Sequence, residues 1–309
     1  MDRLHIFSPA TVANVSCGFD AMGFALEHLG DEMTFQKIPE KRKVTITKIE
    51  GAKLPYDTER NAAGFVAQKM LEDAKVDFGL EIEIVKKYKP GSGLGSSAAS
   101  SAGSAFAVNQ FLHEPFSQLE LVKYAMLGEE VACGAQIADN VSAALYGGFV
   151  LIRSYDPLEI VSIPTPKDLF VTVLHPQIEL KTEDGRNVLP KKVPLTDAVK
   201  QWSNVGGLIS GLYTSDYGLI GRSLEDIIVE PARKLFIPHF DLVKERAIAS
   251  GAVGAGISGS GPSIFALSEG KEQAQKTAHF MDEVYKNKGI EYNIYVSKIG
   301  DQGTRIISA

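Results

Sequence analysis

Apolar residues recur at two spacings along this chain, and each spacing predicts one kind of element. In the first half, alternating apolar and polar positions predict strands at residues 33–39, 44–49 and 80–88. Apolar residues three and four positions apart predict helices at residues 61–74, 96–112 and 117–133. A glycine pair at 147–148 then leads into an apolar strand, residues 149–153. The first half is therefore predicted to mix strands and helices.

A polar stretch with three prolines, residues 154–168, interrupts this pattern and is predicted to be a linker. Beyond it, strands are predicted at residues 170–174, 263–267 and 292–296. Helices are predicted at residues 195–212, 240–250 and 271–286. This mixture predicts the α+β class. Because the chain has 309 residues and a domain has about 150, we expect two domains, residues 1–160 and 161–309.

The composition narrows the class of protein. Hydrophobic residues make up 44% of the chain and charged residues 23%, which excludes a disordered, collagen-like or coiled-coil protein. The formal net charge of −6 provides no overall positive field, so we expect neither nucleic acid nor a membrane as partner. No stretch approaches the roughly 18 apolar residues of a membrane span, and the N-terminus does not resemble a signal peptide. Cys17 and Cys133 stand in no metal-binding spacing and fit a reducing, cytoplasmic setting.

A glycine-rich segment between a predicted strand and a predicted helix is the strongest candidate for chemistry. Its residues are Pro90, Gly91, Ser92, Gly93, Leu94, Gly95, Ser96, Ser97, Ala98, Ala99 and Ser100. The unpaired N–H groups and the dipole at a helix start favour an anion such as phosphate, and glycines let it approach the main chain. Ser96 or Ser97 would cap the helix or bind Mg²⁺. The alternative is a tight turn with a serine cap and no ligand.

Neither standard phosphate motif fits this segment. The P-loop pattern GxxxxGK[ST] requires a lysine after its last glycine, and residues 90–100 contain no lysine. Gly93, Gly95 and Ala98 fit the dinucleotide-binding pattern. That pattern also expects an acidic residue at the end of a second strand about 20 residues further on, but the sequence near Glu120 is predicted to be helical. The patterns of serine hydrolases (GxSxG) and zinc proteases (HExxH) do not occur either. We therefore expect phosphate binding of another type.

Five other polar residues are candidates for a substrate or metal site. Asn14 and Asp20 lie in a turn-rich segment and would bind a hydroxyl or ammonium group, or else form an Asx turn and a helix cap. Glu129 ends a predicted helix and would supply a carboxylate to Mg²⁺, or else face solvent. Asp139 and Asn140 lie among small and apolar residues, where polar groups need partners.

A second glycine-rich loop and two arginines complete the candidates. Residues 254–263, GAGISGSGPS, lead into an apolar strand and would pack against a ligand or form a plain hairpin. Arg186 and Arg233 each lie near prolines that fix the local chain. Each would clamp a carboxylate through bidentate hydrogen bonds, or else remain a surface residue.

Three segments, in this order, resemble the three motifs of the GHMP kinases, which phosphorylate small molecules. They are SPATVANVSCGFD at residues 8–20, PGSGLGSSAA at 90–99 and GAGISGSGPSIFAL at 254–267. The resemblance covers nearly the whole chain. It implies an N-terminal domain with a left-handed βαβ unit, like domain 2 of ribosomal protein S5, and a ferredoxin-like C-terminal α/β sandwich. It also implies ATP, Mg²⁺ and a homodimer.

Within that family, the first motif, the ADN tripeptide at 138–140 and the stretches around the two arginines are most similar to homoserine kinases. The resemblance implies phosphorylation of the side-chain hydroxyl of L-homoserine to O-phospho-L-homoserine in threonine biosynthesis. By the same resemblance, the residues that hold the amino acid and its hydroxyl are Asn14, Asp20, Asp139, Asn140, Thr182, Arg186 and Arg233. The two arginines would bind its carboxylate, and Thr182 would face the reacting region.

The same resemblance assigns Mg²⁺ to Ser97, or its neighbour Ser96, and to Glu129. The substrate hydroxyl would attack the γ-phosphorus of ATP in line, and positioning with charge neutralisation would supply most of the rate. The position where mevalonate kinases have a basic aspartate is Asn140, whose amide cannot take a proton at neutral pH, so no base catalysis is claimed.

One position departs from the pattern of the homoserine kinases. Ile137 precedes the ADN tripeptide, where that group usually has a histidine. Isoleucine there would repack the pocket wall or admit a related substrate. The alternative functions are therefore a GHMP kinase for another small carboxylate-bearing alcohol, such as mevalonate or shikimate, and a non-catalytic nucleotide-binding regulator. Ser97 and Glu129 favour a kinase over the regulator.

Overall fold

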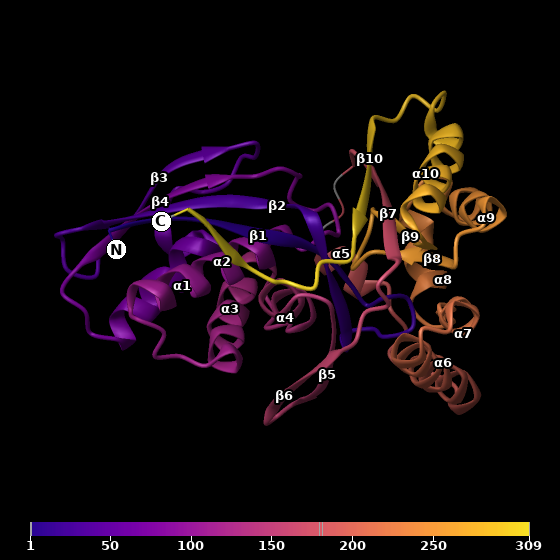
Figure 1. Cartoon of the computed structure of the whole chain (residues 1–309), viewed down its shortest axis with the longest axis horizontal. Coiled ribbons are helices and arrows are strands. Elements are labelled where there is room, and N and C mark those ends of the chain that lie inside the picture. The colour runs from indigo at the N-terminus through magenta and orange to yellow at the C-terminus, as the bar shows by residue number, and fades with distance from the viewer. Residues whose placement is uncertain (1, 179, 181, 309) are drawn as a thin grey trace.

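The computed structural model describes residues 2–178, 180 and 182–308, without the side chains of Thr182 and Asp184. The chain forms two β-sheets, each covered by helices, that meet near the middle of the molecule (Figure 1). Within the described ranges, no helix combines the length and the hydropathy that a membrane crossing requires.

In the described part of the chain, the first sheet has seven strands, in the order β11-β1-β2-β4-β3, with β5 paired to β2 and β6 paired to β5. The strands are β1 (Arg3–Ala13), β2 (Met22–Ile38), β3 (Val44–Glu50), β4 (Gly79–Val85), β5 (Phe149–Tyr155), β6 (Leu158–Ile163) and β11 (Arg305–Ser308). β3 and β4 are parallel and are connected through helix α1, which makes a βαβ unit. The other neighbouring strands are antiparallel.

Helices cover one face of this first sheet (Figure 1). They are η1 (Thr58–Arg60), α1 (Ala62–Asp73), α2 (Ser96–Phe111), α3 (Gln118–Cys133) and α4 (Asp139–Tyr146). α2 is central, because it contacts α1, α3, α4 and β1. Its alanine- and serine-rich sequence lets these neighbours approach closely, and its buried alanines belong to the core beneath the sheet.

The second sheet has the strand order β10 (Tyr292–Lys298), β7 (Leu169–Pro176), β9 (Ile264–Glu269) and β8 (Gly254–Ile257). Counted along the chain, this order is fourth, first, third, second, with every pair antiparallel, which is the predicted ferredoxin-like arrangement. Helices α9 (Phe240–Ser250) and α10 (Lys271–Tyr285) pack against it. The remaining helices are α5 (Thr182–Asn187), α6 (Leu195–Thr214), α7 (Tyr217–Ser223), α8 (Glu230–Arg233) and η2 (Lys234–Phe236).

A shared hydrophobic core joins the two sheets. Phe24 on β2 packs against Phe149 on β5 and Phe265 on β9, with ring centroids 4.9 and 6.0 Å apart. All three side chains are fully buried, and each such burial stabilises the fold by about 1.5–3 kcal/mol. This core fixes the second sheet against the first.

The linker predicted at residues 154–168 is wrong. β5 ends at Tyr155 and β6 begins at Leu158, so much of this stretch forms an antiparallel hairpin in which Phe149 pairs with Ile163. Pro157 occupies the turn of that hairpin instead of an interdomain connection. The division at residue 160 falls within β6, and β11 returns from the end of the chain to pair with β1. The two-domain division therefore stays a prediction.

Candidate active site

A cavity of about 900 Å³ lies where the glycine-rich segment, α3, α4, α5 and α8 meet. This volume is within the range of small-molecule sites. The lining residues that the sequence singled out are Asn14, Asp20, Pro90, Gly91, Ser92, Gly93, Gly95, Ser96, Ser97, Ser100, Glu129, Ile137, Asp139, Asn140, Arg186 and Arg233. Leu94, Ala98 and Ala99 are instead fully buried in the core. The structure therefore brings most of the candidates to one cavity.

The glycine-rich segment has a backbone that side chains would disfavour. Gly93 has φ +77°, and a Cβ there would lie 2.5 Å from the carbonyl oxygen of Ser258. Gly95 has φ +64° and precedes α2, and no described side chain caps this helix. The predicted serine cap is therefore wrong, because a left-handed glycine occupies the capping position. The first N–H groups of α2 keep their capacity to bind an anion.

The second glycine-rich loop forms the β8–β9 hairpin, and its turn supports the first loop. The Ser258 hydroxyl donates to the carbonyl oxygen of Gly93 at 2.6 Å. The N–H of Ser263 donates to the carbonyl oxygen of Ser92 at 3.2 Å. The hairpin therefore holds the glycine-rich segment in place, and its turn also lines the cavity.

Two buried oxygens near the start of α2 have no hydrogen-bond partner among the described residues. They are Oγ of Ser96 and Oε1 of Glu129. Burial raises the pKa of Glu129 to about 7, and the Ser97 side chain partly opposes this shift. Mg²⁺ prefers oxygen ligands and usually keeps water and phosphate oxygens among them, so these residues fit that ion. The described residues hold no cluster of three acidic, histidine or cysteine side chains that would enclose a metal.

Lys86 lies beneath the start of α2 and was not singled out from the sequence. Its ammonium group forms a buried ion pair with Asp31 and donates to the carbonyl oxygen of Ser96 (2.6 Å) and the hydroxyl of Ser100 (3.0 Å). A buried charge that loses its partner is strongly destabilising, so Lys86 stays paired with Asp31. Its hydrogen bonds to Ser96 and Ser100 then fix the first turn of α2. The lysine lies in the strand predicted at residues 80–88, where nothing in the sequence marks its charge as buried.

Opposite charges line the cavity where α5 and α8 meet the turn after β1. Arg186 donates through Nη2 to both carboxylate oxygens of Asp20, at 2.8 and 3.0 Å. Arg233 is buried, and its Nε and Nη1 donate to the carbonyl oxygens of Gly185 (3.0 Å) and Gly259 (2.9 Å). Burial lowers the pKa of Arg233 to about 10, and the Asp20 carboxylate opposes this. Arg233 therefore stays a cation at neutral pH.

The turn after β1 places Asn14 and Asp20 beside these arginines. Asn14 has φ +68°, its Nδ2 donates to the carbonyl oxygen of Gly259 at 2.9 Å, and its Oδ1 accepts the N–H of Asp20 at 3.0 Å. Asp20 pairs with Arg186 and does not cap a helix in the described chain. Phe19, which the sequence analysis missed, lies 5.1 and 5.7 Å from the two guanidinium groups, within range of a cation–π interaction.

Helix α4 begins with the pair Asp139 and Asn140. Oδ1 of Asn140 accepts the hydroxyl hydrogen of Thr11 at 2.6 Å, and Oδ1 of Asp139 accepts the N–H of Asn140 at 2.6 Å. Burial raises the pKa of Asp139 to about 7, with the charge of Asp20 as a second cause. Ile137 lines the cavity just before this pair. These two polar residues thus have the partners that their apolar surroundings required.

Other lining residues were not singled out from the sequence. Among them are Leu54, Pro55, Arg60 and Asn61, before α1. Asn61 caps α1 by accepting the N–H groups of Ala63 (3.1 Å) and Gly64 (3.3 Å). An asparagine before a helix was the only local signal there. The side chain of Thr182, a predicted site residue, lies outside the described part of the chain.

Comparisons with known proteins agree with this arrangement. Residues 61–148 match the family described as GHMP kinases N terminal domain, and residues 208–287 match GHMP kinases C terminal. A homoserine kinase from Chlorobaculum tepidum is 44% identical over 315 aligned positions, which cover 98% of this chain and 97% of that protein. The chain belongs to the homoserine kinase family of the GHMP kinases.

A solved structure extends the match with the homoserine kinase family to three dimensions. The crystal structure of homoserine kinase from Cytophaga hutchinsonii matches with a TM-score of 0.95 at 49% identity, and it covers 99% of this chain and 98% of that one. The family and the α+β GHMP kinase fold predicted from the three motifs are thereby confirmed. Membership of this kinase family implies the use of ATP.

Proposed function

We propose that this chain transfers the γ-phosphoryl group of ATP to the side-chain hydroxyl of L-homoserine, which gives ADP and O-phospho-L-homoserine in threonine biosynthesis. One observation carries the proposal: a single cavity is lined by the glycine-rich segment and by Asp20, Arg186 and Arg233. An anion-binding helix start beside opposite charges suits a nucleotide next to a zwitterionic amino acid.

The charges around Asp20 favour an amino acid over the other alcohols considered. Asp20 and Arg186 form an ion pair at 2.8 Å. A zwitterionic substrate would replace both halves of this pair, with its ammonium group on Asp20 and its carboxylate on Arg186 and Arg233. Mevalonate and shikimate carry a carboxylate but no ammonium group. The carboxylate of either would bind Arg186 and leave Asp20 without a cationic partner. This supports L-homoserine over both.

Positioning accounts for the proposed reaction. Asn14, Asp20 and Asn140 would hold the amino and hydroxyl ends of the substrate. Asp139 orients the Asn140 carboxamide, because its Oδ1 accepts a hydrogen bond from Nδ2 of Asn140 at 3.3 Å. Thr182 is assigned to the reacting region by resemblance alone. The hydroxyl oxygen attacks the γ-phosphorus in line, the bond to the bridging oxygen breaks, and ADP leaves with that electron pair. No protein base is assigned to the hydroxyl proton, because the Asn140 amide cannot accept it, and the proton passes to solvent as the new oxygen–phosphorus bond forms.

The start of α2 would hold the phosphates of ATP. The unpaired N–H groups at the start of α2 and the helix dipole favour these anions. Ser97, or Ser96, and Glu129 would hold Mg²⁺, which two unpaired buried oxygens at this position support. When bound, the ion would neutralise charge on the phosphate oxygens.

A substrate panel tests this function. ADP release with Mg²⁺ and ATP would be measured in a coupled assay with L-homoserine, mevalonate, shikimate and galactose, and the product would be identified by ³¹P NMR. We expect turnover with L-homoserine and O-phospho-L-homoserine as product. Turnover with another alcohol alone would keep a kinase and overturn the substrate. Nucleotide binding without turnover of any alcohol would favour the regulator.

Replacing Arg233 by alanine is expected to raise KM for L-homoserine about 10- to 100-fold, because a charge-assisted hydrogen bond contributes about 1.5–3 kcal/mol. KM for ATP and kcat should change less than about threefold, since the contact exists already in the ground state. Steady-state kinetics measure all three. Lys234→Ala is the matched control, because this neighbouring cation pairs with Asp241. An unchanged KM in Arg233→Ala would make Arg233 a structural residue only.

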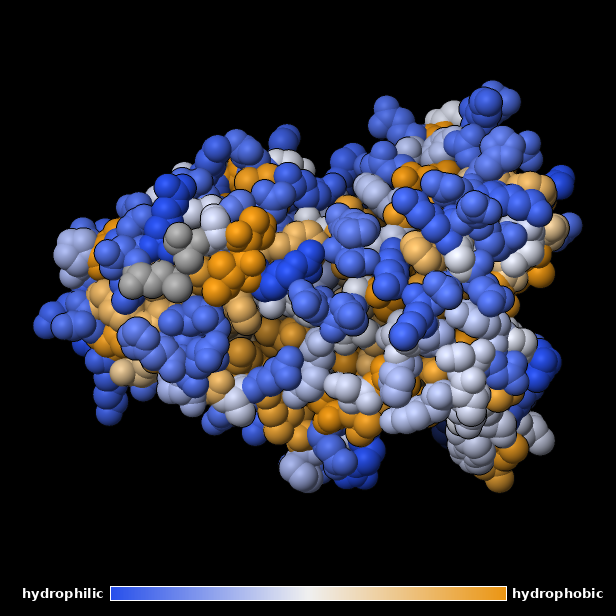
Figure 2. Space-filling model, viewed as in Figure 1, coloured by the Kyte–Doolittle hydropathy of each residue, from blue (hydrophilic) through white to orange (hydrophobic). Residues whose placement is uncertain are grey.

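We also propose that two copies pair through α6, as the family resemblance implies a homodimer. Exposed apolar side chains follow its outer face at helical spacing: Leu195, Val199, Trp202 and Tyr213. Figure 2 shows hydrophobic side chains at the lower right, over the outer end of α6. Antiparallel pairing would bring Lys191 and Lys192 near one helix start to Asp216 beyond the end of the other, which is complementary in charge.

Light scattering tests this pairing. The unchanged chain is expected to give twice the mass of one chain. Trp202→Glu is expected to give the mass of one chain, because it places a charge in the apolar face. A monomeric unchanged chain, or a Trp202→Glu variant that stays dimeric, would overturn pairing through α6.

We further place the chain in the cytoplasm. Both of its cysteines are described, and both are free thiols, which supports a reducing compartment.

A further inference from the structure

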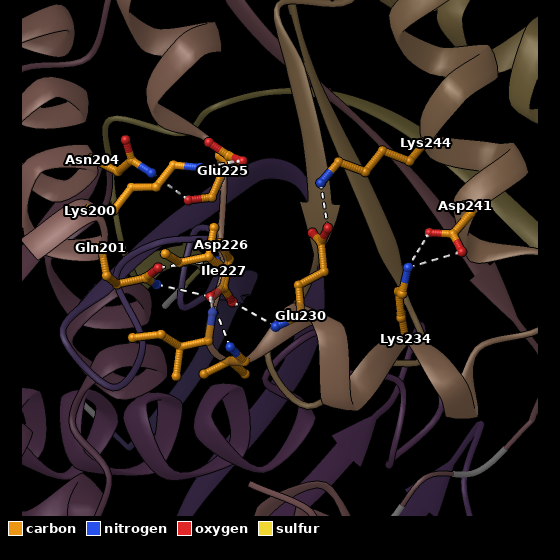
Figure 3. Close-up of polar contacts among 12 residues, drawn as sticks. Lys200, Gln201, Asn204, Glu225, Asp226, Ile227, Glu230, Lys234, Asp241 and Lys244 are labelled. Carbon is orange, nitrogen blue, oxygen red and sulfur yellow. Dashed lines mark hydrogen bonds and ion pairs between the residues drawn. The ribbon is translucent and has the colours of Figure 1, made fainter. Parts of the chain in front are cut away.

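A buried polar cluster joins α6 to the start of α8 (Figure 3). It reaches the turn after β1 through the carbonyl oxygen of Cys17. We infer that its two central residues, Gln201 and Asp226, are positioning residues that fix Arg233 relative to Asn14 and Asp20. Both are buried, and the cavity is lined by other residues. The inference rests on the proposed function, which assigns these three lining residues to the amino acid.

Asp226 organises the start of α8. Its Oδ1 accepts the N–H groups of Ile228 (3.0 Å) and Val229 (2.9 Å), and its Oδ2 accepts the N–H of Glu230 (2.9 Å). Glu230 is the first residue of α8 and Val229 is its cap, so this carboxylate holds the N–H groups that lead into the helix, which have no partner within it. Arg233 lies at the other end of this four-residue helix. The position of its guanidinium group therefore follows from where Asp226 makes the helix begin.

Gln201 connects that helix start to the turn after β1. Its Nε2 donates to Oδ1 of Asp226 at 2.9 Å and to the carbonyl oxygen of Cys17 at 3.0 Å. Its Oε1 accepts the N–H of Ile227 at 3.2 Å. These three bonds occupy both amide hydrogens and the oxygen, so one orientation of the carboxamide satisfies them all. In Figure 3, Gln201 points from α6 to Asp226 and Ile227.

The elements that this cluster joins meet again at the cavity. Nδ2 of Asn14 and Nη1 of Arg233 both donate to the carbonyl oxygen of Gly259, each at 2.9 Å. A shift of α8 against the turn would break this shared contact and change the separation of the Arg233 cation from Asp20. The cluster touches neither the glycine-rich segment nor Glu129 in the described contacts. Its loss should therefore affect the amino acid and spare the nucleotide.

Two substitutions test this role by the split between KM and kcat. Asp226→Asn keeps the size of the side chain but replaces one of its two acceptor oxygens by an NH₂ group, which cannot accept a hydrogen bond. We expect KM for L-homoserine to rise about tenfold, with KM for ATP and kcat within about twofold. Gln201→Met keeps the length without hydrogen bonds and should raise the same KM about threefold. The double variant should raise the KM for L-homoserine by less than the product of the two single fold-changes, because both residues act through one hydrogen-bond network.

Two controls separate positioning from a general loss of stability. Asp241→Asn breaks the ion pair with Lys234, next to Arg233, outside the cluster (Figure 3). Thr277→Val removes a buried hydroxyl that hydrogen-bonds Ser250 at 2.8 Å, away from the cavity, and should lower Tm. Both should keep the KM for L-homoserine.

The outcomes are distinct. An unchanged KM for L-homoserine in folded Asp226→Asn, or an equal rise in Thr277→Val at an equal loss of Tm, would overturn the inference. If Asp226→Asn does not fold, Gln201→Met decides by the same criteria. If the unchanged chain does not turn over L-homoserine, the proposed function fails, and this inference fails with it.

Discussion

Replacing Glu129 by glutamine is expected to lower kcat about 10²–10³-fold, while the affinity for L-homoserine stays within about twofold. The side chain is buried, and its Oε1 has no hydrogen-bond partner in the described chain. A neutral amide is a poor Mg²⁺ ligand, so charge on the phosphate oxygens would go uncompensated in the transition state. Folding should survive, because glutamine resembles the protonated acid and burial raises the pKa of Glu129 to about 7.

Glu130→Gln is the matched control for this variant, because it removes the same charge one residue away. Glu130 is exposed and accepts a hydrogen bond from Gln136 at 2.7 Å. Single-turnover kinetics measure the chemical step, and calorimetry compares ADP binding with and without Mg²⁺. We expect Glu129→Gln to weaken only the Mg²⁺-dependent binding. Equal loss of activity in both variants, or none in Glu129→Gln, would remove Glu129 from the metal site.

Helices were predictable from the sequence where local signals bounded them. The predicted helix at 96–112 corresponds to α2 (Ser96–Phe111), and the predicted helix at 240–250 is α9 (Phe240–Ser250). α2 follows a glycine that cannot easily continue a helix backwards, and α9 ends before Gly251 in a left-handed conformation. The glycines that bound these helices lie next to the helix ends in the sequence, so the local pattern was enough to locate both helices.

Strands buried on both faces were harder to predict. β1 was missed because its second half, SPATVA, is buried at every position, which removes the alternation that marks a half-exposed strand. The hairpin of β5 and β6 was mistaken for a linker because Pro157 gives the same local signal in a turn as between domains. Only the pairing of β6 with β5, a contact across the hairpin, distinguishes the two.

The types of residue in the site were visible in the sequence, but their meeting was not. Asp20 and Arg186 are 166 positions apart, and Asn14 reaches the carbonyl oxygen of Gly259 across 245 positions. Spacing along the chain cannot show such contacts, and the family resemblance alone assigned these residues to one site. Asp226 lies in no motif and was not singled out, and aspartates are mostly exposed in proteins. Its importance follows from burial, which only the fold reveals.

Replacing Gly93 by alanine is expected to raise the Kd for Mg²⁺-ATP about 100-fold or more. The left-handed backbone at φ +77° disfavours alanine by about 1–2 kcal/mol. In addition, the new Cβ would lie 2.5 Å from the carbonyl oxygen of Ser258 and 2.7 Å from that of Gly261. Both are main-chain atoms of the β8–β9 turn and cannot rotate away. The glycine-rich segment must therefore shift, and its N–H groups would leave the phosphates. Calorimetry measures the affinity.

Gly289→Ala separates the two causes of this effect. Gly289 also has a left-handed backbone, φ +69°, but a Cβ there would meet no described atom within 4 Å. This variant should lose about 1–2 kcal/mol of unfolding free energy and keep its nucleotide affinity. Equal affinity in both variants would show that the two glycine-rich loops need not approach closely for ATP to bind. A loss confined to Gly93→Ala would instead attribute nucleotide binding to that close approach, because both variants carry the same backbone strain.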